Sequence, residues 1–156
     1  SWWSTIRENL TFWVEKHNES SIWEYLEKFW LAEKVRKGPN WLDSEIDDKI
    51  NFSGGEKQIL TFIRLLLQDR PIVILDEGTN QLDAENELLV MSELLSKKND
   101  KIIIFITHRM STISQADYIY CIDKHTMSHS WNHRTLLEEG KNAYARFYRA
   151  QVLGER

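Results

Sequence analysis

Carboxylates and a histidine follow two short aliphatic runs. Asp76 and Glu77 come directly after Ile72–Leu75, and His108 lies just beyond Ile102–Ile106. Such runs are typical of strands buried on both faces of a parallel sheet. Ligands of open α/β sheets bind outside the carboxyl ends of the strands, so we expect these side chains to converge on one edge, with one carboxylate near a cation and the other near a water. An isolated Asp-Glu pair more often caps a helix, but the strand before it and the later histidine favour chemistry.

A second set of residues is suited to binding an anion. Ser53, Gly54 and Gly55 precede an apolar pattern that predicts a helix from Glu56 to about Gln68. Glycines let a ligand approach the backbone, and the unpaired N–H groups and dipole at a helix start favour an anion. An isolated Ser-Gly-Gly is more often a plain turn into a helix. Here a strand ending in Asp-Glu follows, so both sets point to phosphate chemistry.

Alternating strands and helices must position these residues. Between the two aliphatic runs, residues 84 to about 98 have the amphipathic pattern of a helix, as in a right-handed crossover between parallel strands. Residues 118–122 predict a third strand, and residues 142–152 a final helix. This order predicts an open α/β sheet.

The N-terminal part has a different pattern, and we expect it to be helical. Thr5 with Glu8 and Ser21 with Glu24 have capping-box spacing, and the helix after Ser21 should end at Gly38. Six of the seven tryptophans lie here: Trp2, Trp3, Trp13, Trp23, Trp30 and Trp41.

Composition excludes several classes of protein. The 156 residues suffice for one domain, and a net charge of -4 without a basic run gives no reason to expect a nucleic-acid partner. Cys121 is the one cysteine, so we expect no disulfide framework. A reducing compartment is therefore the expected location. No apolar run approaches the roughly 18 residues of a membrane span, and the start lacks the layout of a signal peptide. At a membrane, another segment would have to anchor the protein.

The ordered motifs resemble those of ATP-binding-cassette (ABC) ATPases. FSGGEKQ resembles their signature sequence, PIVILDE their Walker B strand, NQLD their D-loop and THRMSTI their switch-histidine segment. STIRENLTF resembles the start of the helical subdomain of exporter-type members, and residues 116–151 are similar to the end of their nucleotide-binding domains. The resemblance implies a P-loop NTPase-like α/β fold. Residues 1–56 would form a helical subdomain with the signature loop, and residues 57–156 the C-terminal part of the ATPase core, a mainly parallel sheet with flanking helices.

The resemblance also implies roles for single residues. Asp76 would support Mg²⁺, Glu77 would polarise the attacking water, and His108 would contact the γ-phosphate of ATP. Asp83 would lie at the interface between two cassettes. The signature residues would contact ATP held by the opposite cassette: Ser53, Gly54, Gly55 and Glu56.

A P-loop is absent from this sequence. The pattern G-x-x-x-x-G-K-[ST] is not supplied by any of the six glycines. The chain thus resembles the second half of a cassette, and we expect that alone it neither binds nor hydrolyses ATP appreciably. The resemblance implies an ATPase domain of an exporter at the cytoplasmic face of a membrane. Its partners would be a Walker A half, a second nucleotide-binding domain and transmembrane domains.

Two other functions remain open at this point. One is the C-terminal lobe of a non-transport ABC ATPase of the SMC or DNA-repair kind, although no heptad pattern predicts a coiled coil. The other is a non-catalytic partner that donates only its signature, against which the presence of Glu77 and His108 argues.

The tryptophans also have two interpretations. Helical spacing, as between Trp23 and Trp30, favours a core role. Alternatively, Trp2, Trp3 and Trp41 lie on a surface that contacts the transmembrane domains, because aromatic side chains are favoured anchors of interfaces.

Several residues depart from the family pattern. Glu56 stands where glutamine is usual, and Gly78 replaces the usual alanine after Glu77. SEIDDKI lacks the glycine of the exporter segment that faces the transmembrane domains. His125 and Trp131 replace glycines of a hairpin, so we expect an irregular hairpin.

A row of potential zinc ligands offers a rival hypothesis. These residues recur every four positions and would share one face of a helix or one side of a strand: Cys121, His125, His129 and His133. The resemblance instead makes this segment a strand, a turn and a strand, which would separate them.

Overall fold

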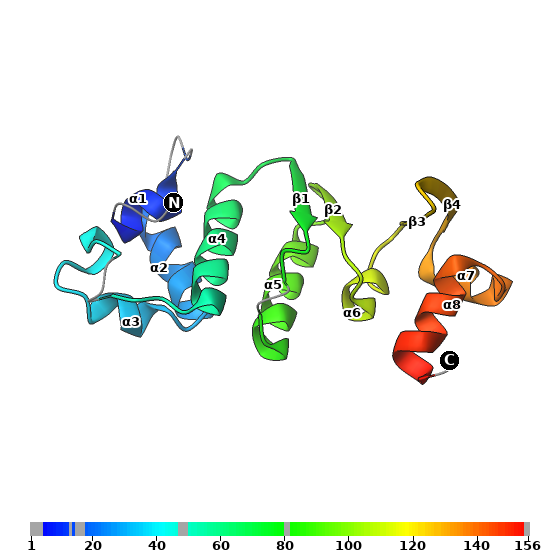
Figure 1. Ribbon diagram of the computed structural model, residues 1–156. Helices are drawn as coiled ribbons and strands as arrows, with labels where there is room; N and C mark the ends of the chain where they lie inside the picture. Colours follow the sequence, from blue (N-terminus) through cyan, green and yellow to red (C-terminus); the bar gives the residue numbers. More distant parts are fainter. Residues whose placement is uncertain (1–4, 13, 15–17, 47–49, 80–81, 155–156) are drawn as a thin grey trace. The chain divides into compact units, whose positions relative to one another are not determined.

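The computed structural model describes residues 5–12, 14, 18–46, 50–79 and 82–154 (Figure 1). It contains two compact units, residues 1–104 and residues 105–156. The predicted boundary between residues 56 and 57 falls inside a helix, and a division into subdomains at that point stays a prediction.

The first half of unit 1 is helical, as predicted. It contains α1 (Ile6–Thr11), α2 (Glu19–Lys28), α3 (Ala32–Arg36), the 3-10 turn η1 (Trp41–Asp43) and the long α4 (Gly54–Gln68). Helices α1 and α2 both pack against α4. Their apolar faces form the buried core, which includes Ile6, Leu10, Ile22, Leu26, Ile59 and Ile63.

The predicted capping boxes have different outcomes. The first is confirmed, because Thr5 and Glu8 cap α1 reciprocally. The second is wrong: α2 begins earlier, with Asn18 as its N-cap, and the Asn18 side chain accepts a hydrogen bond from the Ser20 N–H at 3.0 Å. Asparagine caps a helix as well as serine does, and it comes first in the chain.

The single helix predicted to end at Gly38 is divided in two. Trp30 has a left-handed backbone with φ of 55°, which ends α2 and lets α3 start in a new direction. The break buries Phe29 and Leu31 and leaves Trp30 58% exposed. The core role predicted for Trp30 is therefore wrong, and Trp41 is equally exposed. Three further tryptophans, Trp2, Trp3 and Trp13, lie outside the described residues.

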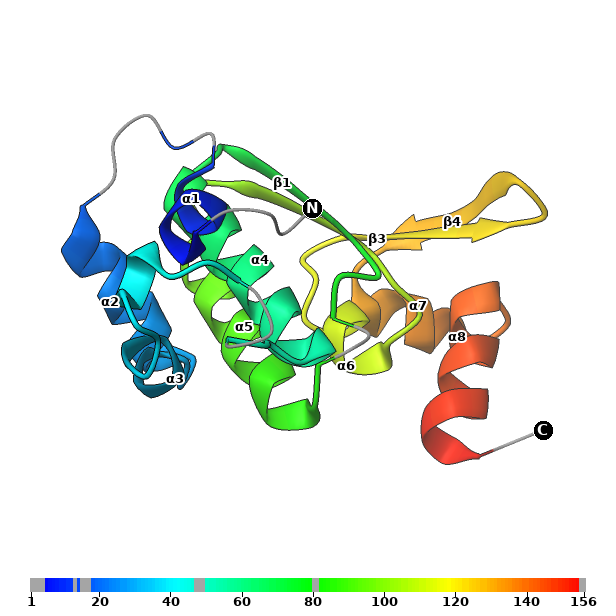
Figure 2. The same cartoon turned by 60° about the vertical axis from the view of Figure 1, so that its left-hand side comes forward.

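The second half of unit 1 has the predicted order of strand, helix and strand. Strand β1 (Ile72–Asp76) is followed by α5 (Ala84–Ser96) and β2 (Ile102–Ile106), whose last residues enter unit 2. The strands are parallel neighbours (Figure 2). The Ile102 N–H, at the start of β2, donates to the Pro71 carbonyl at 2.9 Å.

Burial on both faces of these strands, which we predicted, is not observed. Val73 is buried, but Ile72, Ile74 and Ile102 are 55%, 62% and 60% exposed. Two strands with an open apolar face are marginally stable in water by themselves, since sheets in domains are covered by a further layer. The exposed isoleucines are therefore a surface on which another layer can pack.

Unit 2 is built from a hairpin and the helical segments beside it. The strands β3 (Ile119–Asp123) and β4 (Thr126–Trp131) are antiparallel. The helical segments are α6 (Met110–Ile113), α7 (His133–Glu139), α8 (Ala143–Tyr148) and the π-helical turn η2 (Arg149–Leu153). Its core contains Met110, Ile119, Leu136 and Tyr144.

The hairpin is irregular, as predicted. Its register shifts between Cys121 and Ile122, and the turn residues Lys124 and His125 have φ values of 49° and 63°. A two-residue turn of this kind normally uses Asn or Gly because these residues tolerate positive φ. Among the described helices of both units, none has the length and apolar character needed to cross a membrane.

Candidate functional site

The serine and glycines of the signature-like sequence form the start of α4. Ser53 is the N-cap residue: its Oγ accepts from the Glu56 N–H at 3.2 Å, and its own N–H donates to Glu56 Oε2 at 2.7 Å. Gly54 and Gly55 form the first turn, where backbone N–H groups have no partner within the helix. The Ser53 hydroxyl accepts one hydrogen bond and keeps its proton for donation. This loop can therefore present several donors to an anion.

Glu56 has a second partner that sequence reasoning missed. Lys34 on α3 donates from Nζ to Glu56 Oε2 at 2.5 Å, and its ammonium lies 5.1 Å from the centre of the buried Phe52 ring. Burial raises the pKa of Glu56, but the hydrogen bonds from Lys34 and Ser53 lower it more, so the pKa lies below 4.5. The carboxylate is thus charged at neutral pH.

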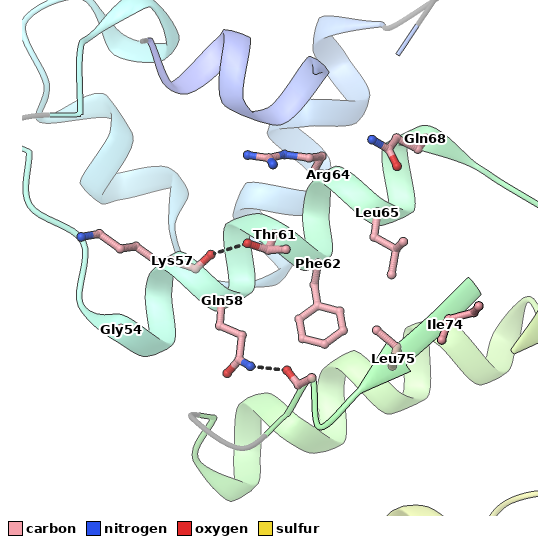
Figure 3. A pocket seen from close by; sticks show the side chains of 11 residues that line it. Gly54, Lys57, Gln58, Thr61, Phe62, Arg64, Leu65, Gln68, Ile74 and Leu75 are labelled. Atoms are coloured by element: carbon pink, nitrogen blue, oxygen red, sulfur yellow. Dashed lines mark hydrogen bonds between the residues drawn. The ribbon is translucent and has the colours of Figure 1, made fainter. Parts of the chain in front are cut away.

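The carboxylates Asp76 and Glu77 lie at the end of β1, as predicted, and both are exposed. Glu77 has a left-handed backbone with φ of 48°. Helix α4 contacts the residue after Glu77 directly, because Gln58 Nε2 donates a hydrogen bond to the Gly78 carbonyl (Figure 3). One side chain therefore connects the helix that begins at Ser53 to the turn that carries Glu77.

A cavity of about 600 Å³ lies between α4 and β1 within unit 1. Figure 3 shows Phe62 and Leu75 pointing toward one another across it, with Gln58 at one end. Its lining also includes Lys57, Thr61, Arg64, Leu65, Gln68, Ile74 and the glycines at 54 and 78.

The carboxylates at the end of β1 suit a hard cation that is shared with phosphate. In the described ranges, no group of three or more His, Cys, Asp or Glu residues is arranged to hold a metal ion. Mg²⁺ is usually bound through one or two carboxylates plus substrate phosphates, with several waters retained. The exposed Asp76 carboxylate fits that kind of site, and Glu77 beside it is left to act on a water.

Asp83 has a structural role in this chain. It is the N-cap of α5, and its carboxylate accepts hydrogen bonds from the backbone and side-chain nitrogens of Asn86, both at 2.9 Å. The hydrogen bond from the Asn86 N–H is the main cause of the lowered pKa of Asp83. The carboxylate is exposed, so the cap leaves it accessible to a partner.

His108 belongs to unit 2, where it is exposed. It follows β2, as predicted, and precedes α6; the Arg109 N–H donates to Thr107 Oγ1 at 3.0 Å. Asp76 and Glu77 belong to unit 1, so the convergence of His108 with them stays a prediction.

The proposed row of zinc ligands is distributed over two strands, the turn between them and a helix. Cys121 in β3 pairs with His129 in β4, and His125 lies in the turn between them. His133 begins α7, and its Nδ1 lies 2.5 Å from the Tyr144 hydroxyl. Among the described residues, these four share neither one helical face nor one strand, and no group of three or more His, Cys, Asp or Glu is placed to hold a metal ion. The zinc hypothesis is therefore not supported.

Sequence reasoning missed the roles of Lys34 and Gln58 for different reasons. Gln58 lies inside FSGGEKQ, and its spacing from Ser53 places it on the helix, but nothing in the pattern indicates its partner at Gly78. Lys34 is 22 residues from Glu56, and no local spacing links them.

A model of the ABC transporter family matches residues 3–80, which is half of the chain. The chain belongs to the ABC transporter family. Over 152 residues it is 35% identical to an ATP-dependent lipid A-core flippase of Haemophilus influenzae, covering 96% of this chain and 26% of that protein. It is 36% identical over 135 residues to a multidrug resistance ABC transporter ATP-binding and permease protein of Lactococcus lactis, covering 85% of this chain and 23% of that protein.

A solved structure extends the comparison to the ABC fold. A bacterial Atm1-family ABC exporter with ATP bound matches with a TM-score of 0.82 and 26% identity, covering 96% of this chain and 26% of that chain. This confirms the predicted mixed α/β ABC ATPase fold of the exporter type. The ABC chain described here spans about a quarter of the length of the curated relatives it matches.

Proposed function

We propose that this chain is the C-terminal portion of an exporter's nucleotide-binding domain and that it carries parts of two different ATP sites. The main support is the arrangement of unit 1. Ser53 directly precedes α4, and Glu77 directly follows β1, the next element along the chain. Gln58 on α4 links the two by a hydrogen bond to the Gly78 carbonyl. Helix α4 thus connects the loop at Ser53 to the turn that carries the two carboxylates.

The first part serves the ATP of a partner cassette. The amides of Gly54 and Gly55, the Ser53 hydroxyl and the positive end of the α4 dipole favour a phosphate. The exposure of Ser53 and Gly54 supports a ligand that arrives from outside this chain.

The second part serves ATP held by a P-loop of the same domain. Asp76 would hold Mg²⁺, which when bound neutralises charge that develops on the phosphates. Glu77 orients and polarises the attacking water, and His108 donates to the γ-phosphate. Positioning and charge stabilisation supply most of the catalysis in phosphoryl transfer, so neither part is sufficient alone.

The P-loop is supplied by another segment. None of the glycines of this sequence forms one. The exposed isoleucine face of β1 and β2 supports this proposal, because a large apolar face without a covering layer is typical of a surface that packs against a partner. The complete domain would cover it.

The working assembly is a pair of cassettes attached to transmembrane domains at the cytoplasmic face of a membrane. The relatives named an ATP-dependent flippase and an ATP-binding and permease protein match most of this chain, which supports this assembly. The exposed Trp41 is a suitable anchor for a contact with such domains.

The function is tested with the complete protein that carries this sequence. Glu77→Gln should lower ATP hydrolysis roughly a hundredfold or more, while ATP binding persists, because general-base catalysis contributes about that factor. Glu85→Gln, an exposed glutamate in the first turn of α5, is the matched control and should hydrolyse ATP at the unaltered rate. Equal rates for Glu77→Gln and the unaltered protein would contradict the proposal.

A further inference from the structure

A carboxylate lies in the first turn of the helix that is expected to bind phosphate. Glu56 is the third residue of α4, and its side chain folds back to accept from the Ser53 N–H at 2.7 Å. Ser53 and Glu56 are thus in contact, so a phosphate at the Ser53 hydroxyl would meet a like charge nearby. Like charges at close range repel, and a neutral glutamine at this position would avoid the problem.

The negative charge is matched by Lys34. Its ammonium donates to the same oxygen, Glu56 Oε2, that accepts from the Ser53 N–H. The Lys34 and Glu56 side chains are only 35% and 27% exposed. Another pair that involves α3 is a surface pair, since Lys37 and Glu33 are 74% and 82% exposed. Surface pairs contribute little, whereas a half-buried pair is less screened by solvent.

The position of Lys34 is itself fixed by packing. Its ammonium lies 5.1 Å from the centre of the Phe52 ring, and Phe52 is 2% exposed. An ammonium near an aromatic ring is attracted to the ring face. Phe52 directly precedes Ser53, so Lys34 contacts both sides of the loop, at Phe52 and at Glu56.

We propose that Lys34 is a positioning residue of the signature loop, which neutralises Glu56 and holds its carboxylate against the Ser53 backbone so that the loop presents a net neutral surface to the triphosphate of the opposite cassette. The pair Lys34–Glu56 replaces the neutral glutamine of the usual signature. This inference rests on the proposed function.

The test is a double-mutant cycle in the complete protein, with MgATP as the ligand. Lys34→Met removes the charge but keeps the stem over Phe52, and it should raise the KM for ATP roughly tenfold with kcat within about twofold. In the Glu56→Gln background, the same Lys34→Met change should alter the KM less than about twofold. Lys34→Arg keeps the charge and should stay within about threefold of the unaltered KM.

A readout without nucleotide accompanies the kinetics. Loss of the Lys34 hydrogen bond should raise the pKa of Glu56, as followed by NMR of the side-chain carboxyl. Lys37→Met is the matched control, because it removes a lysine from the C-cap of the same helix, and both the KM and the pKa of Glu56 should stay at the unaltered values.

Two outcomes would overturn the inference. One is an equal rise in the KM after Lys34→Met in both backgrounds, which would mean that Lys34 acts without Glu56. The other is an unchanged KM after Lys34→Met in the Glu56 background. Either result, obtained in a protein that still hydrolyses ATP and loses hydrolysis on Glu77→Gln, leaves the proposed function intact. The double variant Lys34→Met, Glu56→Gln distinguishes the effect of charge from a loss of folding. Its KM returns to the unaltered value only if the unpaired Glu56 charge causes the rise in the single variant.

Discussion

The hydrogen bond from Gln58 to the Gly78 carbonyl predicts a specific kinetic defect. Gln58→Met keeps the length of the side chain and removes the donor. The lost bond is worth about 1 kcal/mol net. Glu77 has a left-handed backbone with φ of 48°, a conformation that costs a non-glycine residue about 1 kcal/mol or more. Without this hydrogen bond, the backbone at Glu77 relaxes more readily to an unstrained conformation, which moves the Glu77 carboxylate.

The expected result is a selective loss of turnover. A change of about 1 kcal/mol lowers the equilibrium constant between the observed turn and its relaxed forms about fivefold, so kcat should fall by up to about fivefold. The KM for ATP should change less than about twofold, because in the proposed function Glu77 orients water and does not hold nucleotide. The assay is steady-state MgATP hydrolysis by the complete protein.

Gln68 is a matched control for this variant. It lies on the same helix, and its Nε2 also donates to a backbone carbonyl, that of Phe12, at 2.9 Å. Gln68→Met therefore removes the same kind of bond at the opposite end of α4. Equal losses of kcat in the two variants, or an unchanged kcat in Gln58→Met, would refute a role of Gln58 in holding the Glu77 turn.

Three further predictions concern stability and titration. Gly78→Ala should raise the free energy of unfolding by about 0.4–1 kcal/mol, because alanine restricts the unfolded chain more than glycine does. In the folded state the nearest neighbours of an added Cβ are atoms of Leu75 and Phe62 at ordinary contact distances of 3.4–3.6 Å. A lower denaturation midpoint would show that the turn needs glycine. Against the effect of burial, hydrogen bonds from Lys34 and Ser53 lower the pKa of Glu56 below 4.5 in the folded state, so its contribution to stability is present above pH 4.5 and is lost as the pH falls through the folded pKa. Below pH 4.5 the denaturation midpoint should therefore fall more steeply than in Glu56→Gln, and parallel curves would contradict this. Burial raises the pKa of Tyr144 to about 12, so the neutral phenol stabilises unit 2 below pH 10, and this contribution is lost between pH 10 and 12. The difference in phenolate absorbance between the unaltered protein and Tyr144→Phe should therefore titrate near pH 12. A midpoint near pH 10 would refute this prediction.

Much of unit 1 was predictable because its signals are local. Helix α4 follows from its apolar stripe, although it begins at Gly54 and not at the predicted Glu56 because Ser53 caps it, and β1 and β2 follow from uninterrupted aliphatic runs. These elements also fix where Asp76 and Glu77 occur, since both come at the end of β1. The predicted roles of these residues in catalysis stay predictions.

The failures have a common physical cause, which is the competition between local pattern and tertiary packing. The helical spacing through Trp30 predicted one helix, but a left-handed residue at that position buries Phe29 and Leu31 instead. The aliphatic strands predicted two covered faces, whereas one set of isoleucines is exposed. The contacts of Lys34 and Gln58 join residues far apart in the chain, and no periodicity reports such pairs.

The central claim is that this chain carries parts of two ATP sites and a complete site of neither. Its most direct test is a titration of MgATP into the purified 156-residue chain, followed by calorimetry, beside the same titration of the complete protein. The account predicts no saturable binding to the chain alone and saturable binding to the complete protein. Micromolar, magnesium-dependent binding of ATP to the chain alone would contradict it.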